Sequence, residues 1–275
     1  MYIVATPIGN MGDMTTRAIE TLKNVDIIAV EDTRRSGKLL RYFDISTSMI
    51  AVHEHNERQI CDSLLKRIEL GESIALISDA GTPLLSDPGY FLVNQARDHG
   101  LNVVPIPGVS AVITALSVAG LPTDRFVFEG FLPAKSSARQ QRMEKLKDDT
   151  RTVIFYEAPH RIVDMLKDCQ SVFGGKRKVV LTRELTKTFE TIHGDELDKL
   201  VPWVEADENQ RKGEFVVLVH GAEARDSAGI DAEAERILLI LLKDLPVKQA
   251  ASLAANITGL KKNALYQYAL TLKQK

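Results

Sequence analysis

The stretch IALISDAGTPLLSDPG, residues 74–89, joins a short apolar run to a loop rich in aspartate, proline and glycine. The run Ile74–Ile77 has the composition of a buried strand, and proline and glycine after such a run are ordinary turn chemistry. Loops that follow strands in α/β folds also hold ligands more often than other loops do. The stretch therefore predicts a strand of an α/β sheet. It leaves open whether the loop only turns the chain or also binds a ligand.

The first half of the chain repeats this alternation of apolar runs and helical periodicity. The clearest helix is expected over residues 57–70, where the apolar side chains fall on one stripe. Regular alternation of strand and helix predicts a mainly parallel sheet with helices on both faces. The expected strands cover residues 2–5, 25–30, 49–53, 73–78 and 102–105.

The pattern changes after Gly120-Leu121-Pro122. Fewer helices separate the later apolar runs, which favours a mixed sheet with antiparallel pairs. The expected strands there cover residues 126–131, 152–156, 179–183, 189–193 and 215–220. We therefore expect a two-domain α/β protein, with a parallel-sheet domain over residues 1–120 and a mixed-sheet domain over 121–222. The boundary between them is expected near residues 118–125.

A small helical tail is expected over residues 230–275. Residues 221–229 have the small, polar composition of a linker. Three short helices follow, at 232–242, from Pro246, and at 261–272, and the break at Ile257-Thr258-Gly259 resembles a helix-turn-helix unit. Residues 246–275 contain five lysines and no acidic residue. Either an RNA-binding module or a solvated helical cap fits this composition.

The composition is that of a globular protein. The chain has 275 residues, 44% hydrophobic and 26% charged, with a net charge of −2, which argues against a protein that coats nucleic acid but permits local basic patches. Its two cysteines, Cys61 and Cys169, form neither a disulfide framework nor a metal cage by themselves, and we expect no metal site. No apolar stretch has the length of a membrane span, and Met1–Val4 does not open a secretory signal. We expect a cytoplasmic protein.

Three loops that follow strands predict a ligand site. They are residues 6–10, 78–89 and 105–111, and in a parallel sheet they meet at the carboxyl edge, where ligands bind. Backbone N–H groups at Val109–Ala111 open a helix and favour an anion. No glycine-rich dinucleotide fingerprint, phosphate-binding loop or nucleophile elbow is present in the sequence. A flat polar molecule gripped mostly by main chain fits these loops best.

The chain also resembles a known family over residues 2–220. The segments concerned are TPIGNMGDMTTRA, AVEDTRRSGKLL, HEHNE, SDAGTPLLSDPG, GLPTDRFVFEGFLP, FYEAPHR, RELTKTFETIHG and RKGEFV. In this order they are similar to the 16S ribosomal RNA methyltransferase I family, within the tetrapyrrole methylase superfamily. The tail, with KKNALYQYAL, resembles the helical C-terminal piece of many members.

This resemblance implies a two-domain tetrapyrrole-methylase-like fold, usually a homodimer. It implies an enzyme that uses S-adenosylmethionine to methylate the 2′-hydroxyl of a cytidine in the decoding centre of 16S rRNA, in the small ribosomal subunit. Carried over by position, the cofactor contacts are Pro7, Ile8, Gly9, Asp79, Ala80, Gly81, Thr82, Pro83, Ser110 and Ala111. Within the quoted loop, Asp79–Pro83 should face the ligand, and Ser86-Asp87-Pro88-Gly89 should cap the next helix.

Methyl transfer to a ribose hydroxyl benefits from a base or from a charge that stabilises the alkoxide. Asp32, His53 and Lys187 stand at strand ends or in polar clusters and are the candidates for this role. Two basic segments and the tail are candidates for RNA binding. Their residues are Arg34, Arg35, Lys38, Lys135, Arg139, Arg142, Lys261 and Lys262. Ion pairing or plain solvation of a helix face explains each of these charges equally simply.

Two other functions stay open at this point. One is a methylase of the same superfamily that acts on a tetrapyrrole or on a protein side chain. The other is a non-enzymatic ribosome assembly factor that uses the tail to bind RNA. The basic segments and the EDTR and HEHNE blocks favour rRNA over the first, and the DAGTP loop favours cofactor binding over the second.

Overall fold

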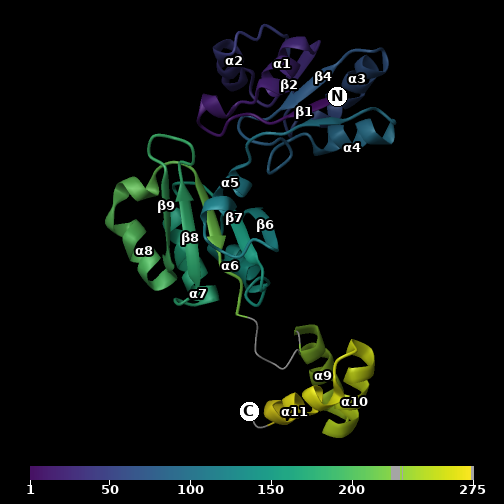
Figure 1. The fold of residues 1–275 in the computed structure, drawn as a ribbon, viewed down its shortest axis with the longest axis vertical. Coiled ribbons are helices and arrows are strands. Elements are labelled where there is room, and N and C mark those ends of the chain that lie inside the picture. The colour runs from purple at the N-terminus through teal and green to yellow at the C-terminus, as the bar shows by residue number, and fades with distance from the viewer. Residues whose placement is uncertain (224–229, 231, 274–275) are drawn as a thin grey trace. The chain divides into compact units, whose positions relative to one another are not determined.

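A computed structural model describes residues 1–223, 230 and 232–273. The chain divides into two compact units, Met1–Ala222 and Glu223–Lys275. The first unit contains two five-stranded sheets, and the second is helical (Figure 1).

All strands of the first sheet run parallel, as the sequence predicts. Their order is β3-β2-β4-β1-β5, so the chain crosses over between neighbouring strands. β2 and β4 are buried at every position, which explains their unbroken apolar runs. The strands are β1 (Tyr2–Val4), β2 (Ile27–Val30), β3 (Met49–Ala51), β4 (Ile74–Ile77) and β5 (Val104–Ile106).

Two helices cover each face of this sheet. Side chains of α1 (Thr16–Asn24) and α2 (Thr33–Tyr42) share one buried cluster with the strands. Side chains of α3 (Glu57–Glu69) and α4 (Tyr90–Asp98) share a second cluster on the opposite face. The stripe expected over residues 57–70 is thus the buried face of α3, with Leu64 and Leu65 inside.

The second sheet is mixed, again as predicted, in the order β6-β7-β10-β8-β9. Only β6 and β7 pair in parallel, and the other pairs are antiparallel. β9 begins two residues later than expected, since the chain before it forms turns in which the Lys187 N–H donates to the Glu184 carbonyl and the Glu190 N–H to the Lys187 carbonyl. The strands are β6 (Phe126–Phe131), β7 (Thr152–Glu157), β8 (Lys178–Arg183), β9 (Thr191–Glu196) and β10 (Phe215–Val219).

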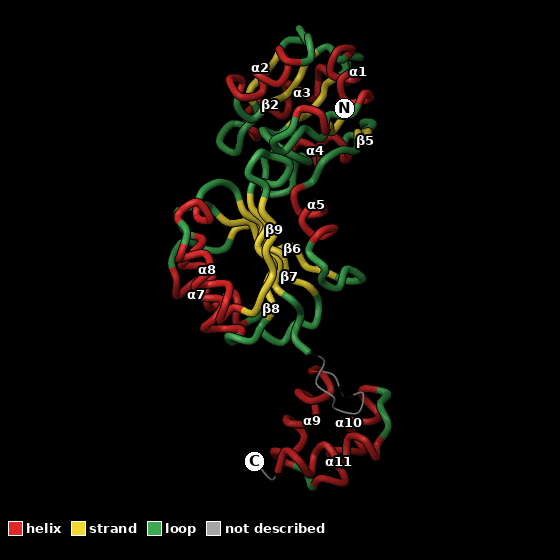
Figure 2. The backbone as a smooth tube through the Cα atoms, turned by 60° about the vertical axis from the view of Figure 1, so that its left-hand side comes forward, coloured by secondary structure: helices red, strands yellow, loops and turns green. Residues whose placement is uncertain are grey.

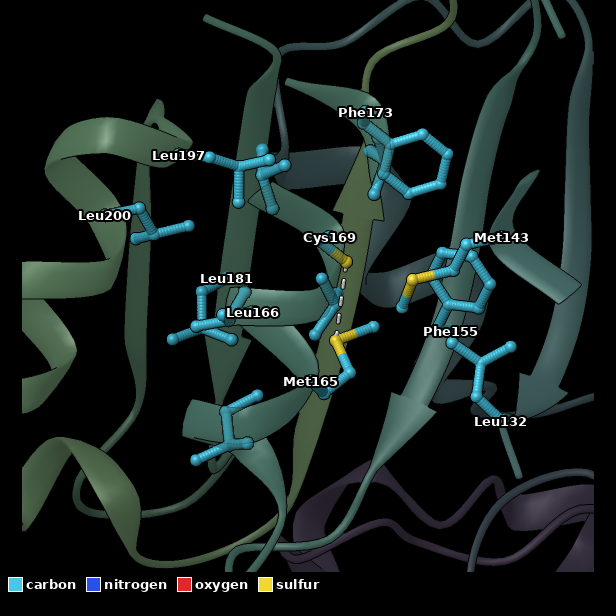
Figure 3. Close-up of a cluster of buried hydrophobic side chains, with 14 of the residues drawn as sticks. Leu132, Met143, Phe155, Met165, Leu166, Cys169, Phe173, Leu181, Leu197 and Leu200 are labelled. Atoms are coloured by element: carbon cyan, nitrogen blue, oxygen red, sulfur yellow. Dashed lines mark hydrogen bonds between the residues drawn. The ribbon is translucent and has the colours of Figure 1, made fainter. Parts of the chain in front are cut away.

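Three helices pack on one face of the second sheet, and Figure 2 shows two of them, α7 and α8, beside its strands. They are α6 (Ser136–Glu144), α7 (Ile162–Phe173) and α8 (Leu197–Ala206). Figure 3 shows the core between α7 and the strands, where the Cys169 thiol contacts the Met165 sulfur at 3.7 Å. Both cysteines are buried and reduced. Short 3-10 helices lie at Met11–Asp13 and Glu208–Arg211.

The other face of the second sheet is covered by α5 (Ala111–Val118). Val112, Ala115 and Leu116 of this helix are buried against the strands. The chain therefore passes from one sheet to the other before residue 111, ahead of the expected 118–125. The helix sequence AVITALSV is uncharged and mainly apolar, so either sheet could bury it. The sequence alone therefore does not reveal on which sheet it packs.

The second unit is a bundle of α9 (Ala232–Asp244), α10 (Val247–Thr258) and α11 (Lys262–Lys273). Its core is built largely from alanines and leucines of all three helices. Gly259 ends α10 at a φ of 73°, a left-handed angle that glycine adopts without a steric cost. α9 is less buried than its composition suggests, since Leu239 and Ile240 are 45% and 49% exposed. Most of the expected linker, residues 224–229, lies outside the described residues.

Candidate active site

The loops after β1 and β4 are tied to one another at the carboxyl edge of the first sheet. The backbone N–H of Thr6 donates to the Gly81 carbonyl at 2.8 Å, and the N–H of Gly81 donates back at 3.0 Å. The Thr6 hydroxyl also donates to the Ser78 carbonyl at 3.2 Å. Gly81 has a φ of 84°, which favours glycine, and exposes main chain beside Ile8. These bonds hold the two loops in one position.

The loop before α5 joins this pair. The Thr82 hydroxyl donates to the Val109 carbonyl at 2.9 Å. Gly108 lies so close to Ala5 that an added Cβ would stand 2.9 Å from the Ala5 Cβ. The backbone N–H groups at the start of α5, next to Ser110, thus meet the other two loops. The predicted convergence of the three loops is present in the structure.

A pocket opens where these loops face the second sheet. Ile8, Ala80, Gly81, Thr82, Ser110 and Ala111 are the predicted cofactor residues that line it. Pro7, Gly9, Asp79 and Pro83 belong to the same loops without lining it. The remaining wall consists of Leu85, Ser86, Asp87, Phe131, Tyr156, Glu157, Leu185, Glu214, Phe215 and Val216. An apolar wall with a few polar groups is typical of a small-molecule site.

The second half of the opening loop does more than cap a helix. Gly89 does stand at the N-terminal cap of α4, with a φ of 117°. Ser86 and Asp87, however, line the pocket, and Leu84 and Ser86 take φ values of 74° and 68°. Such left-handed angles in non-glycine residues cost energy and are held only by their surroundings. The expected helix cap is therefore present at Gly89, and Ser86 and Asp87 line the pocket in addition.

Asp87 has an unusual electrostatic environment. Burial, together with the negative charges of Glu31 and Asp79, raises the pKa of its carboxyl to about 6, while a hydrogen bond from Ser78 opposes the shift. Burial likewise raises the pKa of Tyr156, to about 12, with help from the charge of Asp87. Tyr156 packs edge-on against Phe128, with ring centroids 4.9 Å apart, and against Phe131 at 5.5 Å.

None of the three predicted catalytic residues lines the pocket. Asp32 caps α2 by accepting from the Arg34 N–H at 2.8 Å, and this arginine lowers the pKa of the carboxyl. The Lys187 ammonium contacts Glu184 at 2.9 Å and Glu214 at 2.7 Å. Burial would lower the pKa of Lys187, but these two carboxylates outweigh it and raise the pKa. Lys187 is therefore charged at neutral pH and suited to stabilising an anion.

His53 lies in a tight turn before α3. Its backbone N–H donates to the Asn56 side chain at 2.8 Å, and its ring lies edge-on to that of His55 at 6.0 Å. Among the described residues its buried Nδ1 has no hydrogen-bond partner. The structure thus gives His53 an unused polar atom outside the pocket lining.

The basic candidates differ in accessibility. Lys38 and Lys135 are exposed, and so are Lys261 and Lys262 of the tail. Arg34 is 89% exposed and pairs with Asp32, while Arg35 pairs with Asp79. Arg142 pairs with Glu129.

Arg139 is different, because its side chain is 3% exposed. Its guanidinium bonds to Asp168 at 2.6 Å and to the Ala134 carbonyl at 3.2 Å. This inward position leaves it no surface on which to meet RNA. The described residues include no cluster of three or more metal-ligating side chains and no helix long and apolar enough to cross a membrane.

Comparison with known proteins decides the family. The model described as Tetrapyrrole (Corrin/Porphyrin) Methylases matches residues 1–201, and the model of the RsmI C-terminal HTH domain matches residues 228–273. A relative from Vibrio cholerae serotype O1, named Ribosomal RNA small subunit methyltransferase I, is 57% identical over 98% of this chain and 94% of its own length. The chain belongs to the ribosomal RNA small subunit methyltransferase I family. It is a methyltransferase, as the sequence predicts.

Two solved structures share the fold of this methyltransferase. Diphthine synthase superimposes with a TM-score of 0.62 at 14% identity, covering 80% of this chain and 89% of its own. Uroporphyrin-III C-methyl transferase from Thermus thermophilus, in complex with S-adenosyl homocysteine, gives a TM-score of 0.54 at 17% identity, covering 79% and 95%. The predicted two-sheet tetrapyrrole-methylase-like fold is confirmed.

Sequence reasoning missed the half of the pocket that the second sheet supplies. Tyr156 and Glu157 stand at the end of β7, and Glu214 and Phe215 at the start of β10. The segments FYEAPHR and RKGEFV contain these residues and were part of the family resemblance, so a signal for them exists. Asp87 lies in the very loop that the sequence singles out.

Proposed function

We propose that this methyltransferase uses S-adenosylmethionine to methylate the 2′-hydroxyl of a cytidine in small-subunit ribosomal RNA, cytidine 1402 by the family resemblance. The observation that carries the proposal is the pocket formed by the three predicted loops, in a chain 57% identical over its length to a relative named for small-subunit rRNA methylation.

The residues present fit this cofactor. Leu85, Leu185 and Val216 offer an apolar surface for a flat adenine ring, and Phe131 and Tyr156 offer aromatic faces. The start of α5 offers backbone N–H groups to a carboxylate. The Ser110 hydroxyl, buried and without a partner among the described residues, is available to a polar group of the ligand.

We assign the cofactor to the ten loop residues expected to hold it, with Ile8, Gly81 and Ser110 in direct contact. S-adenosylmethionine supplies an electrophilic methyl group on a sulfonium. The chain's own contribution is to fix the loops, exclude water with the apolar wall and align the acceptor oxygen with the bond that breaks.

The RNA surface of this proposal consists of the exposed basic side chains. It includes Arg34, Arg35, Lys38, Lys135, Arg142, Lys261 and Lys262. Arg139 is left out because its guanidinium is buried on Asp168. Exposed cations of this kind bind phosphates by releasing counterions, so their effect depends on salt. We also propose that the active species is a homodimer, which light scattering tests by giving twice the mass of one chain.

The decisive experiment supplies labelled S-adenosylmethionine and small ribosomal subunits from a strain that lacks this methylation. We expect label in the rRNA, mapped to one cytidine ribose. Label in a tetrapyrrole or in a protein instead would replace the proposed substrate. No transfer at all, with intact RNA binding, would favour an assembly factor.

A further inference from the structure

Three carboxylates line the pocket, and they differ in their partners. Glu157 is fully buried and pairs with the Arg161 guanidinium at 3.0 Å. Glu214 pairs with Lys187 at 2.7 Å. Asp87 forms no ion pair with any described residue, and no cation contributes to its pKa shift. A carboxylate without a cationic partner accepts a proton more readily than one held in an ion pair, so Asp87 can have a different chemical role from Glu157 and Glu214.

Asp87 also stands between two hollows. Together with Ser86 it lines both the cofactor pocket and an adjoining acidic hollow on the first-sheet side. The other residues of the acidic hollow are Glu31, Glu54, Glu57, Pro88, Gly89 and Tyr90. A proton that Asp87 accepts from a ligand in the pocket can therefore pass into the acidic hollow, whose glutamates also bind protons.

The backbone around Asp87 is fixed at both ends. Leu84 and Ser86 hold left-handed angles before it, and Gly89 follows with a φ of 117°. The Glu57 carboxylate accepts from the Leu92 N–H at 2.8 Å, which anchors the start of α4 behind the loop. The backbone strain is thus located at the residues that present Asp87 to the pocket, where such strain is often functional.

The charges around Asp87 are almost all negative. The titratable or charged groups facing it, from every element packed there, are Glu31, Asp79 with its partner Arg35, Glu54, Glu57, Tyr90, Tyr156, Glu157 and Glu214. Burial, with the charges of Glu31 and Asp79 from this set, raises the pKa of Asp87 to about 6. A carboxylate with this pKa is ionised at neutral pH and is a much stronger base than an ordinary aspartate.

The other candidates are less suited to take a proton. Arg34 lowers the pKa of Asp32, and the paired carboxylates raise that of Lys187, which is therefore already protonated. We propose that Asp87 is the general base of the methyl transfer, accepting the proton of the acceptor ribose hydroxyl. This inference rests on the proposed function and adds to it the residue that activates the substrate.

The step balances in atoms and charge. The hydroxyl oxygen forms its bond to the methyl carbon as the carbon–sulfur bond breaks, and its proton passes to an Asp87 oxygen. The products are the methylated ribose, neutral S-adenosylhomocysteine and a protonated Asp87. Glu31, whose pKa burial and the charge of Asp79 also raise, lies in the acidic hollow and can relay the proton to water.

The test compares wild type with Asp87→Asn on small subunits from the methylation-deficient strain. With both substrates saturating in a single turnover, we expect Asp87→Asn to be slower by about 100-fold or more, the usual contribution of a general base. Dissociation constants for S-adenosylhomocysteine and for rRNA should stay within about threefold. Asp98→Asn, an exposed change on α4, is the matched control and should keep the wild-type rate.

The pH profile gives a readout that a structural role would not move. For wild type, kcat/KM for S-adenosylmethionine should rise with pH and level off above about 6, because the free enzyme's base must be ionised. Asp87→Asn should lose this rise. If Asp87→Asn does not fold, Asp87→Glu is tested instead. Because it keeps a carboxylate at this position, it should retain activity, and the inflection of its pH profile should be displaced from that of wild type.

Three results would overturn the inference while wild type remains active. One is an Asp87→Asn rate within threefold of wild type. Another is an Asp87→Asn enzyme that keeps the wild-type rate at saturation but binds S-adenosylmethionine more weakly, with unchanged affinity for S-adenosylhomocysteine, which lacks the sulfonium charge. Asp87 would then serve only as a counter-ion to the sulfonium. The third is an Asp87→Glu enzyme whose profile matches that of wild type. An inactive wild type would instead contradict the proposed function itself.

Discussion

The aliphatic chain of Lys187 lies directly against Gly9, and a methyl group added to this glycine would collide with the lysine Cγ. Gly9 belongs to the loop after β1, and Lys187 to the turn between β8 and β9. The ammonium of Lys187 then reaches Glu184 and Glu214, and Glu214 lines the pocket. One glycine thus allows the loops of the two sheets to meet at the rim of the site.

Gly9→Ala should therefore destabilise the fold and weaken cofactor binding together. Inserting a methyl group into a packed contact costs about 1–3 kcal/mol when the neighbours cannot move freely. Displacing Lys187 also disturbs Glu214, so the affinity for S-adenosylhomocysteine should fall. Urea unfolding and calorimetric titration measure the two effects.

The matched test removes the obstacle instead of the glycine. In Gly9→Ala/Lys187→Ala the collision with the lysine chain is absent, so this double variant should be less destabilised than the sum of the two single changes. Strict additivity of the two free-energy changes would show that Lys187 does not limit the space at Gly9. Gly71→Ala is unsuitable as a control because its φ of 99° strains any side chain.

A second prediction concerns the buried pair of Arg139 and Asp168. Burial would raise the pKa of the Asp168 carboxyl, but hydrogen bonds from Gln140, Ser136 and Arg139 outweigh it and lower the pKa. Asp168→Ala leaves the Arg139 charge buried without its partner, which should cost about 3–5 kcal/mol in the free energy of unfolding. Replacing both residues, as Arg139→Met/Asp168→Leu, should recover most of this loss in urea unfolding.

The lowered pKa of Asp168 also fixes the direction of the pH dependence. A carboxyl whose folded pKa lies below its unfolded value binds protons more readily when unfolded, so its stabilisation is present above pH 3.8. This stabilisation disappears as the pH falls further, through the folded pKa. The urea midpoint of wild type should therefore fall in acid relative to that of Arg139→Met/Asp168→Leu, which lacks this carboxyl, and a constant difference down to pH 2 would contradict the assignment.

These two residues also show where sequence reasoning reaches its limit. Apolar runs predicted both sheets, because strand formation depends on local composition. The convergence of the three loops was predicted as well, because loops after parallel strands meet at one edge of the sheet. Arg139, by contrast, lies in a run of basic and polar residues and was expected at the surface. Its partner is 29 positions away on α7, and only the packing of α6 on α7 brings the two together.

The same limit applies to the pocket. The first-sheet half consists of loops that meet at the carboxyl edge of one parallel sheet, so residues such as Gly81 and Ser110 could be predicted from the sequence. The second half comes from β7 and β10, whose ends reach the site only because α5 packs on the second sheet. The raised pKa of Asp87 depends first on its burial and then on the charges of Glu31, which follows β2, and of Asp79, at the other end of the same loop. The local sequence pattern does not show the burial or the approach of Glu31.

A third prediction concerns the two thiols. Cys61 and Cys169 are fully buried, and burial raises the pKa of both. Because only the thiolate reacts, neither cysteine should be modified by a disulfide reagent at pH 8 in native protein, and both should react once urea unfolds it. Ser137→Cys, at an exposed position on α6, is the positive control and should react at once. Rapid modification of the native wild type would mean that a core described as closed opens readily.

The last prediction separates RNA contacts from other surface charge. Lys38 and Lys135 are exposed in the two predicted basic segments, and Lys66 is equally exposed on α3, outside them. A lysine that neutralises one phosphate contributes about one unit to the slope of log affinity against log salt. Lys38→Ala and Lys135→Ala should each weaken rRNA binding and lower that slope by about one, as measured by fluorescence anisotropy at several KCl concentrations. Lys66→Ala should leave both unchanged. If all three variants behave alike, these segments bear ordinary surface charge, and the RNA contacts must be sought elsewhere, with the tail lysines Lys261 and Lys262 as the next to test.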